Sequence, residues 1–276
     1  MPTRTRPLPT PARLLAALVV GALLLTACGS DDDASGNETS PIVLVHGAWQ
    51  DGSSWAQVQE ELESSGRTVS AITLPGRDGA DAGLQTIEGY RDAVIAEVEA
   101  FDEPVILVGH SFGGMTISAV AEAIPDQVAS LAYVAAYLPA DGDSLQTLAE
   151  QDHLSVLPEE GNLNFSDDFT VATVPPERFA GIFCPDCVDA DLDAVAASAV
   201  AEPAAPLAQP VSLTGDNFGA VPKTYIMTAR DTVVGTQLQA SMVTRTPVDE
   251  ILVLDTGHAP YVSAAVELAG LLDDLS

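Results

Sequence analysis

A serine between two glycines carries the clearest chemical signal in this chain of 276 residues. Residues 108–115 read Val-Gly-His-Ser-Phe-Gly-Gly-Met, so Ser111 lies at the centre of Gly-x-Ser-x-Gly. An apolar stretch typical of a strand precedes this motif, and a stretch typical of a helix follows it. The two glycine positions allow a tight turn between them, because side chains there would collide with neighbouring backbone. Such a turn presents the serine as a nucleophile, and the N-terminus of the helix favours developing negative charge.

Two later segments end in the polar groups that a nucleophilic serine needs. Residues 224–228 read as a strand followed by Asp231, and residues 251–254 read as a strand followed by His258. Hydrolases with this serine motif present serine, acid and histidine in that order along the chain. We therefore predict that His258 takes the proton from Ser111 and returns it to the leaving alcohol. Asp231 would fix the tautomer of His258 and stabilise the imidazolium.

Two other residues could compete for these roles. Asp255 is an alternative acid, but it lies only three residues before His258, so we expect it to cap the loop or to stay solvated. His46 is an alternative base, but it precedes Ser111 in the chain, against the expected order. We expect His46 to order its own turn by hydrogen bonding.

Two backbone N–H groups are predicted to bind the oxyanion of the reaction. One is the N–H of Phe112, because sites with this serine motif use the N–H of the residue after the nucleophile. The other comes from the loop after an early strand. Residues 46–48, His-Gly-Ala, lie in that position, which makes Ala48 the second donor.

The segments around these residues alternate between two apolar patterns. Short apolar runs predict buried parallel strands, at residues 42–45, 68–74, 104–108, 224–228 and 251–254. Apolar residues spaced three and four apart predict helices, at residues 53–64, 86–101 and 114–123. This alternation predicts an α/β protein with a parallel central sheet and helices on both of its faces.

Residues 141–222 break this rhythm, and we predict that they form a cap over the serine within a domain spanning residues 41–276. A cap of this kind would shape the substrate pocket. Four residues are candidates for its lining, and each could equally belong to the core: Trp49, Tyr137, Leu138 and Phe183.

Short motifs along the chain resemble the hydroxynitrile lyase and plant methyl esterase branch of the α/β-hydrolases, especially its bacterial esterase members. They comprise residues 45–49, Trp55, and residues 74–76, 109–114, 133–139 and 257–258. The resemblance implies the α/β-hydrolase fold, with a mostly parallel central sheet flanked by helices and a cap insertion. It also implies a carboxylic ester hydrolase that acts on small or moderately bulky apolar esters without a metal or an organic cofactor.

The chain departs from the lyases of this branch at two places. Plant hydroxynitrile lyases carry Thr after the His of the first turn and Lys directly after the catalytic His, whereas this chain has Gly47 and Ala259. The lyase reaction needs the positive charge of that lysine near the leaving cyanide. The absence of this lysine disfavours cyanohydrin cleavage, and a carbon–carbon lyase of the hydroxynitrile type is the alternative enzyme. A non-catalytic binding lipoprotein with this fold is the alternative from another class. The complete set of triad residues favours the esterase.

Residues 182–187, Ile-Phe-Cys-Pro-Asp-Cys, resemble the Phe-x-x-Asp-Cys element of related esterases, with Cys184 as an additional cysteine. In an exported protein Cys184 and Cys187 could close as a local disulfide, although so short a loop stabilises little through chain entropy. A zinc site would need two more ligands, and only His153 is conceivable. We therefore predict no metal site.

The first forty residues predict an export signal and a tether. Basic residues precede residues 14–25, which contain only Leu, Ala, Val and Gly and fall short of the ~20 residues of a membrane-spanning helix. Residues 25–28, Leu-Thr-Ala-Cys, resemble the lipobox of bacterial lipoproteins. This implies that residues 1–27 are removed and that Cys28 is lipidated on the outer face of the bacterial cell membrane. An ordinary secretory signal is the alternative. Residues 28–40 are predicted to be a flexible acidic tether.

The charge of the chain limits its partners. It has 40 acidic and 10 basic residues and a formal net charge of -30. Removal of residues 1–27 would delete three arginines and no acid, changing the charge from -30 to -33. This balance disfavours nucleic acids as partners and disfavours electrostatic docking on anionic lipid. Membrane contact would therefore depend on the lipid at Cys28, and the expected partner is a small-molecule ester. The sequence does not indicate an oligomeric state.

Overall fold

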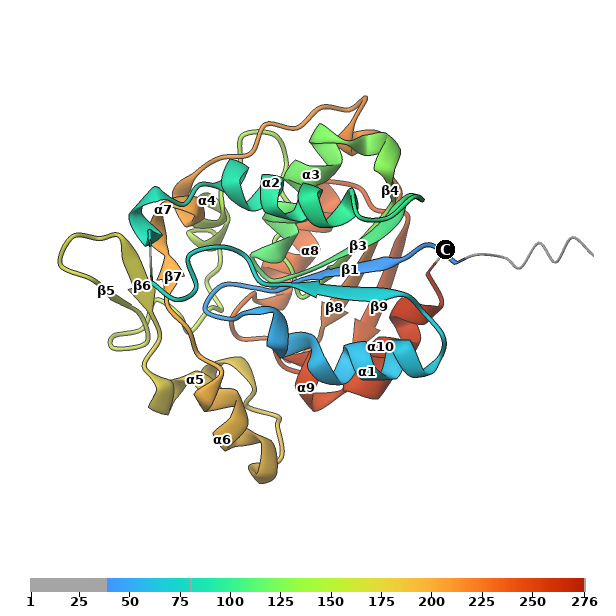
Figure 1. The fold of residues 1–276 in the computed structure, drawn as a ribbon. Helices are drawn as coiled ribbons and strands as arrows, with labels where there is room; N and C mark the ends of the chain where they lie inside the picture. The colour runs from blue at the N-terminus through green and yellow to red at the C-terminus, as the bar shows by residue number, and fades with distance from the viewer. Residues whose placement is uncertain (1–38, 80, 276) are drawn as a thin grey trace, which may run out of the picture. The chain divides into compact units, whose positions relative to one another are not determined.

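The computed structural model describes residues 39–79 and 81–275 of the chain (Figure 1). Its centre is a six-stranded sheet in the order β2-β1-β3-β4-β8-β9, in which every neighbouring pair is parallel. The strands are β1 (Ile42–Val45), β2 (Val69–Ile72), β3 (Val105–His110), β4 (Val128–Val134), β8 (Lys223–Thr228) and β9 (Glu250–Leu254). The predicted α/β class with a parallel central sheet is confirmed. The predicted signal peptide, Cys28 and nearly all of the predicted tether lie outside the described residues.

The order of the strands determines where in the sheet a ligand can bind. Every residue of β1 and β3 is buried, because helices cover both faces of the sheet. The chain runs from β1 outward to β2 and then returns to the other side of β1 to form β3. Connections that leave two adjacent strands in opposite directions open a crevice at their carboxyl ends, where open α/β sheets bind ligands. The turn at Gly47 and the turn at Ser111 follow these two strands.

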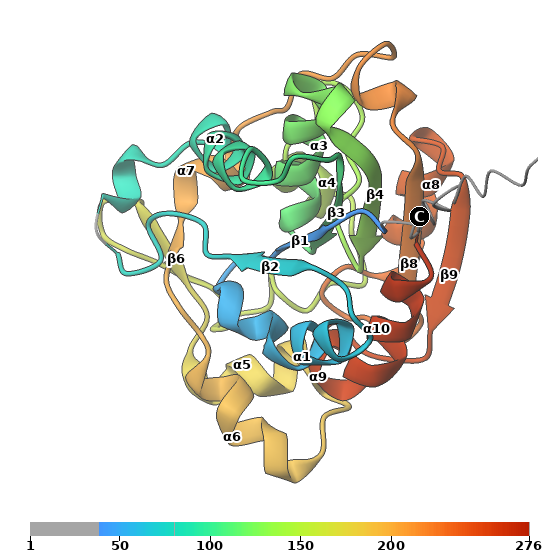
Figure 2. The same cartoon turned by 45° about the vertical axis from the view of Figure 1, so that its right-hand side comes forward.

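Helices cover the sheet on both faces, as predicted. Figure 2 shows α1, α9 and α10 on one side of the strands and α2 and α3 on the other. The flanking helices are α1 (Ala56–Ser64), α2 (Ile87–Val98), α3 (Gly113–Ala123), α8 (Thr236–Arg245), α9 (Pro260–Ser263) and α10 (Ala265–Asp273). The helix predicted from residue 53 begins as the 3-10 turn η1 (Gly52–Trp55), which the Asp51 side chain caps by accepting the Ser53 N–H at 2.9 Å. Among the described residues, no helix is long and apolar enough to cross a membrane.

The strand β4 was not predicted from the sequence, although it lies at the centre of the sheet. Six of its seven residues are buried, so it shows no alternation of apolar and polar positions. A fully buried strand of this kind cannot be distinguished from a buried helix by periodicity alone.

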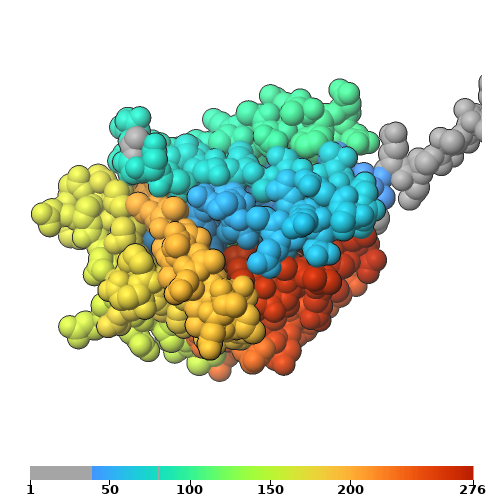
Figure 3. Space-filling model, turned by 60° about the horizontal axis from the view of Figure 1, so that its bottom comes forward, coloured from blue at the N-terminus to red at the C-terminus, as the bar shows by residue number. Residues whose placement is uncertain are grey.

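The chain between β4 and β8 forms a separate set of elements, most of which lie at the left in Figure 1. It contains α4 (Leu145–Ala149), β5 (Asn164–Phe165), β6 (Val171–Thr173), α5 (Pro176–Phe183), α6 (Asp189–Ala197), β7 (Glu202–Pro203), α7 (Ala204–Ala208) and η4 (Phe218–Ala220). Strands β5, β6 and β7 form a small antiparallel sheet. In the space-filling view of Figure 3 this yellow and orange segment spreads over one end of the domain, and part of it lies beside the blue residues that follow β1.

Candidate active site

Ser111 lies on a strained turn between β3 and α3. Its φ of 51° is in the left-handed region, which is rare for residues other than glycine and stores about 1–3 kcal/mol of strain. The flanking glycines are sterically required. A Cβ at Gly109 would lie 2.7 Å from the carbonyl carbon of Gly113, and a Cβ at Gly113 would lie 2.6 Å from the carbonyl oxygen of Val45. The turn therefore holds Ser111 at the carboxyl end of β3, as its sequence predicts.

Asp231 and His258 come together from the ends of β8 and β9. The distance between His258 Nδ1 and Asp231 Oδ2 is 2.8 Å, and neither side chain is exposed to solvent. Asp231 Oδ1 accepts the N–H groups of Val233 and Val234 at 2.8 and 2.9 Å, and Oδ2 accepts the hydroxyl of Thr228 at 2.9 Å. Because Asp231 only accepts, the proton of the shared bond resides on His258 Nδ1.

Two residues that the sequence analysis did not name support this acid. Gln239 on α8 lies with its amide nitrogen 3.4 Å from Asp231 Oδ2, and its amide oxygen accepts the N–H of Thr228 at 3.1 Å. The Gln239 amide nitrogen also lies 3.3 Å from the Thr228 hydroxyl, so Gln239 contacts both Asp231 and the threonine that donates to it. No spacing in the sequence signals either contact, because α8 meets the end of β8 only through the tertiary fold.

The other ring nitrogen of His258 is free to act as a base. Its Nε2 is buried and has no hydrogen-bond partner among the described residues. His110, the neighbour of Ser111, donates through Nε2 to the His258 carbonyl oxygen at 2.9 Å, and the two rings lie 4.6 Å apart. No hydrogen bond joins Ser111 Oγ to His258 Nε2; bonds of this kind often tighten only when substrate binds. Burial, and secondarily the neighbouring His258, keep the pKa of His110 well below its ordinary value, so His110 stays neutral.

The two predicted oxyanion donors have the required backbone environment. Ala48 and Phe112 are buried, and neither N–H donates a hydrogen bond to another described residue. Buried N–H groups without a partner are rare in folded proteins, so such a pair beside a nucleophile is suited to bind an anion. The next N–H, of Trp49, is already taken by the Glu202 carboxylate at 3.0 Å.

A cavity of about 460 Å³ opens next to Ser111. Most of its wall is apolar and comes from the chain between β4 and β8. The lining residues are Trp49, Ser111, Tyr137, Leu145, Gln146, Ala149, Glu150, Asp152, Ser155, Leu157, Pro158, Leu163, Phe165, Ala204, Leu207, Ala208 and Val233. Trp49 and Tyr137 were predicted to line the pocket and do so. Leu138 and Phe183 do not: Leu138 is fully buried, and the Phe183 ring stacks on Phe179 with centroids 4.4 Å apart.

Comparison of the sequence with known protein families identifies the family of this chain. The sequence model described as "Alpha/beta hydrolase family" matches residues 42–271. The chain belongs to the α/β hydrolase family.

Relatives of this hydrolase include plant and bacterial proteins. Methylesterase 7 of Arabidopsis thaliana is 28% identical over 87% of this chain and 97% of its own. The carbendazim hydrolyzing esterase of Nocardioides sp. (strain SG-4G) is 36% identical over 52% of this chain and 58% of its own. Among solved structures, a pyrethroid hydrolase from Sphingobium faniae JZ-2 superposes with a TM-score of 0.75 at 27% identity, covering 85% of this chain and 96% of that one.

In this hydrolase His46 orders the turn after β1, as expected. Its Nε2 accepts the N–H of Leu74 at 3.0 Å, so the ring proton lies on Nδ1, which donates to the Gly47 carbonyl oxygen at 2.8 Å. Burial, reinforced by the charge of Arg77, lowers the pKa of His46 to about 3, and the ring stays neutral. Both nitrogens are occupied, so His46 has no free position for proton transfer.

Asp255 is far more exposed than Asp231. Its side chain is 86% exposed and pairs with Arg230, whose Nε lies 3.1 Å away. Such a solvated carboxylate cannot hold a buried imidazole in one tautomer, so the geometry favours Asp231 as the acid partner of His258.

The cysteine-containing element packs against the loop of the hydrolase that carries His258. Cys184 and Cys187 form a disulfide, with Cα atoms 5.2 Å apart. Asp186, between them, accepts the N–H of Gly257 at 2.8 Å. The Phe183 ring lies 5.6 Å from the His258 ring, so this element supports the histidine loop and does not line the cavity. Among residues 39–79 and 81–275, no group of three His, Cys, Asp or Glu side chains could hold a metal ion.

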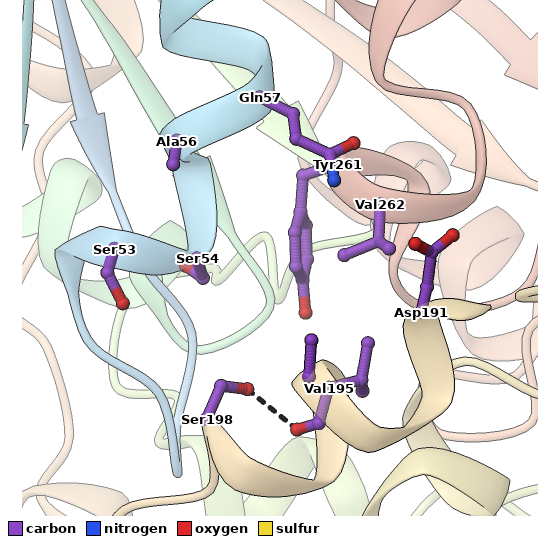
Figure 4. Close-up of a pocket in the computed structure, with 10 residues that line it drawn as sticks. Ser53, Ser54, Ala56, Gln57, Asp191, Val195, Ser198, Tyr261 and Val262 are labelled. Carbon is purple, nitrogen blue, oxygen red and sulfur yellow. Dashed lines mark hydrogen bonds between the residues drawn. The ribbon is translucent and has the colours of Figure 1, made fainter.

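A second hollow of about 150 Å³ lies between η1, α1, α6 and α9 (Figure 4). The Tyr261 side chain points into it towards Val195, and a Ser198 hydroxyl on its floor donates to the Val195 carbonyl oxygen at 2.8 Å. Neither Ser111 nor His258 lines this hollow. Tyr261 instead links it to the core, because its ring packs 4.9 Å from that of His110.

Proposed function

We propose that this α/β hydrolase is a serine esterase that cleaves carboxylic esters through an acyl-enzyme on Ser111. The observation that carries the proposal is the Asp231–His258 hydrogen bond, which leaves His258 Nε2 buried and unpaired beside the strained serine turn. Relatives that span most of this chain include proteins named as a methylesterase, a methyl jasmonate esterase and a pyrethroid hydrolase, which supports ester hydrolysis.

In the first half of the reaction, His258 Nε2 takes the proton of Ser111 as Oγ attacks the ester carbonyl carbon. The N–H groups of Ala48 and Phe112 donate to the oxyanion, and Asp231 stabilises the imidazolium. When the tetrahedral intermediate collapses, the bond to the alcohol oxygen breaks, and His258 returns its proton to the alcohol. The product is an ester of Ser111 and the acyl group.

In the second half, a water molecule replaces the alcohol. His258 Nε2 removes a proton from this water as it attacks the acyl carbon, and the same two N–H groups hold the second oxyanion. The bond to Ser111 Oγ then breaks, the serine regains its proton, and the acid leaves. No cofactor takes part in this scheme.

The substrate class follows from the cavity. A volume of about 460 Å³ with a mainly apolar wall accommodates small to moderately bulky apolar esters. We propose that residues 141–222 act as the cap of this site, since α4 and α7 supply much of the wall. No Lys or Arg lines the described cavity, and Ala259 follows His258, so the site offers no cation to a leaving cyanide. Hydrolysis is therefore favoured over the lyase reaction.

The side chains of Glu150 and Asp152 lie in the cavity wall, and no Lys or Arg lines the described cavity. We therefore predict that the enzyme hydrolyses anionic esters less efficiently than neutral ones. Methyl 4-methylpentanoate and monomethyl succinate have similar shapes, but only the second carries a carboxylate. We expect kcat/KM for the succinate to be lower by about tenfold or more at pH 7, equivalent to ~1.4 kcal/mol, because its charge enters a mainly apolar cavity with two carboxylates in its wall. Glu150→Gln should narrow the difference. Equal kcat/KM for the two esters would contradict this substrate preference.

We further propose that the enzyme is exported and anchored through lipid on Cys28. This proposal is supported by the lipobox-like residues 25–28 and the polar, acidic residues that follow them. When expressed in a bacterium with lipoprotein processing, the full chain should incorporate labelled palmitate and partition into detergent, because two or more acyl chains give stable anchoring. Cys28→Ala should lose both properties, whereas Cys187→Ala should keep them. Unchanged detergent partitioning of Cys28→Ala would refute the anchor.

A further inference from the structure

A buried ionic cluster that the proposed mechanism does not use lies beside the oxyanion turn. Glu202 on β7 is completely buried and interacts with the guanidinium of Arg77. Its Oε1 accepts the hydroxyl of Tyr90 at 3.2 Å, and its Oε2 accepts the backbone N–H of Trp49 at 3.0 Å. The cluster thus connects the small sheet of the cap to the residue that follows Ala48.

Trp49 is held by the segment around β7 at both of its peptide groups. Its N–H donates to Glu202, and its carbonyl oxygen accepts the N–H of Val200 at 3.0 Å. Trp49 also adopts a φ of 59°, a strained left-handed conformation that persists only where its surroundings impose it. These two bonds supply that constraint. They fix the peptide planes on either side of Trp49, including the one that joins it to Ala48.

The same cluster also contacts the second oxyanion donor. Tyr90, whose hydroxyl is bound by Glu202, packs its ring edge-on against Phe112, with centroids 6.0 Å apart. Arg77 lies over the same Tyr90 ring, with its guanidinium carbon 5.2 Å from the ring centroid. Burial raises the pKa of Tyr90, with the charge of Glu202 adding to this effect, so the phenol remains a donor. One buried carboxylate network therefore binds the peptide that follows Ala48 and, through Tyr90, contacts the ring of Phe112.

Stability alone does not account for such a network. Removing two charges from water is costly, and well-packed apolar residues often stabilise a protein as much as a buried ion pair does. We propose that Glu202, paired with Arg77, is a positioning residue that sets the oxyanion turn through the Trp49 peptide. This inference rests on the proposed esterase function. It assigns to the cap a role in orienting the oxyanion donors in addition to enclosing the substrate.

Two double variants separate positioning from stability. Arg77→Met with Glu202→Gln keeps an acceptor for the Trp49 N–H, because the amide oxygen replaces Oε2. Arg77→Met with Glu202→Leu removes that acceptor, and neither variant leaves a buried unpaired charge. We expect the Gln variant to keep kcat close to that of the wild type and the Leu variant to lose roughly 10- to 100-fold in kcat with little change in KM, since loss of a whole oxyanion donor costs about 10²–10³.

An inhibitor pair reports on the oxyanion site directly. A trifluoromethyl ketone forms a tetrahedral adduct with the serine, whereas the matching methyl ketone binds without forming one. In the Leu variant, affinity for the trifluoromethyl ketone should fall by the same factor as kcat/KM, and affinity for the methyl ketone should stay unchanged.

Arg67→Met is the control for both measurements. Arg67 is also buried, but it binds Ser40, Asp273 and Leu275 on the far side of the domain. It should lower the melting temperature without altering either affinity.

Equal kcat and equal inhibitor affinities for the two double variants would overturn the proposal. If the Leu variant does not fold, Val200→Pro tests the other bond of the clamp, because it removes the N–H that binds the Trp49 carbonyl. It should lose several-fold more kcat than Val200→Ala, which keeps that N–H; equal kcat for these two also overturns the proposal. Failure of the proposed function would look different, because the wild type would then not hydrolyse esters or Ser111→Ala would retain the activity.

Discussion

Replacing Ser111 by alanine is expected to reduce kcat for p-nitrophenyl acetate by about 10⁶-fold, equivalent to ~8 kcal/mol of transition-state stabilisation. The variant keeps the cavity and the two oxyanion donors but lacks the atom that forms the acyl-enzyme. Steady-state hydrolysis by the purified protein measures the loss. Mass spectrometry after treatment with a fluorophosphonate should find the label on Ser111 in the wild type and no label in the variant.

Ser155→Ala is the matched control for this experiment, because Ser155 also lines the cavity but lies away from the turn after β3. It should hydrolyse the ester at nearly the wild-type rate. Since the substitution removes only a hydroxyl group, Ser111→Ala should remain folded, which a thermal melt can verify. A folded Ser111→Ala protein that retains full activity would refute the serine mechanism. Failure of the fluorophosphonate to label the folded wild type would favour a non-catalytic binding protein.

Asp231→Asn is expected to lower kcat by about 10⁴-fold while leaving the fold intact. The reason lies in the hydrogen bonds of the carboxylate. The N–H groups of Val233 and Val234 require an acceptor at the Oδ1 position, so the Asn oxygen must lie there. Its NH₂ group then faces His258 Nδ1, which can meet this donor only by losing its proton. The His258 proton moves to Nε2, and this nitrogen can no longer accept the proton of Ser111.

Asp255→Asn provides the matched comparison, since Asp255 is the other acid close to His258 in the sequence and is largely exposed. It should leave kcat nearly unchanged. Measurement of kcat/KM against pH for the wild type and both variants decides between the two acids. A large loss in Asp255→Asn together with an active Asp231→Asn would reverse the assignment.

The elements around the reacting groups were largely predictable because their signals are local. The strand, tight turn and helix around Ser111 follow from a short run of residues in which the glycines are sterically required. The runs at β1, β8 and β9 predict strands for the same reason, since consecutive apolar residues suit a sheet covered on both faces. The prediction that residues 251–254 are buried is wrong, because β9 lies at the edge of the sheet and leaves Ile251 and Val253 exposed. Strand β4 has a similar apolar composition, but no turn or catalytic motif marks where it begins and ends, so it was not predicted.

The supporting residues were not predictable in this way. Thr228 and Gln239 orient Asp231 through side-chain contacts that have no characteristic spacing. Glu202 reaches the Trp49 N–H across 153 positions of sequence. A carboxylate in an acidic chain is usually solvated, and only its burial distinguishes Glu202 from the many solvated acids.

By itself, the sequence determined the α/β-hydrolase class and the identity of the candidate nucleophile, base and acid. It could do so because turn sterics and strand patterns act over a few residues. The tertiary structure decided which groups these residues meet. It buries Asp231 and exposes Asp255, forms the cavity from a segment without a regular pattern, and brings β7 to the oxyanion turn. The physical reason is that burial and hydrogen-bond partnership depend on contacts between distant segments, and these contacts leave no periodic trace along the chain.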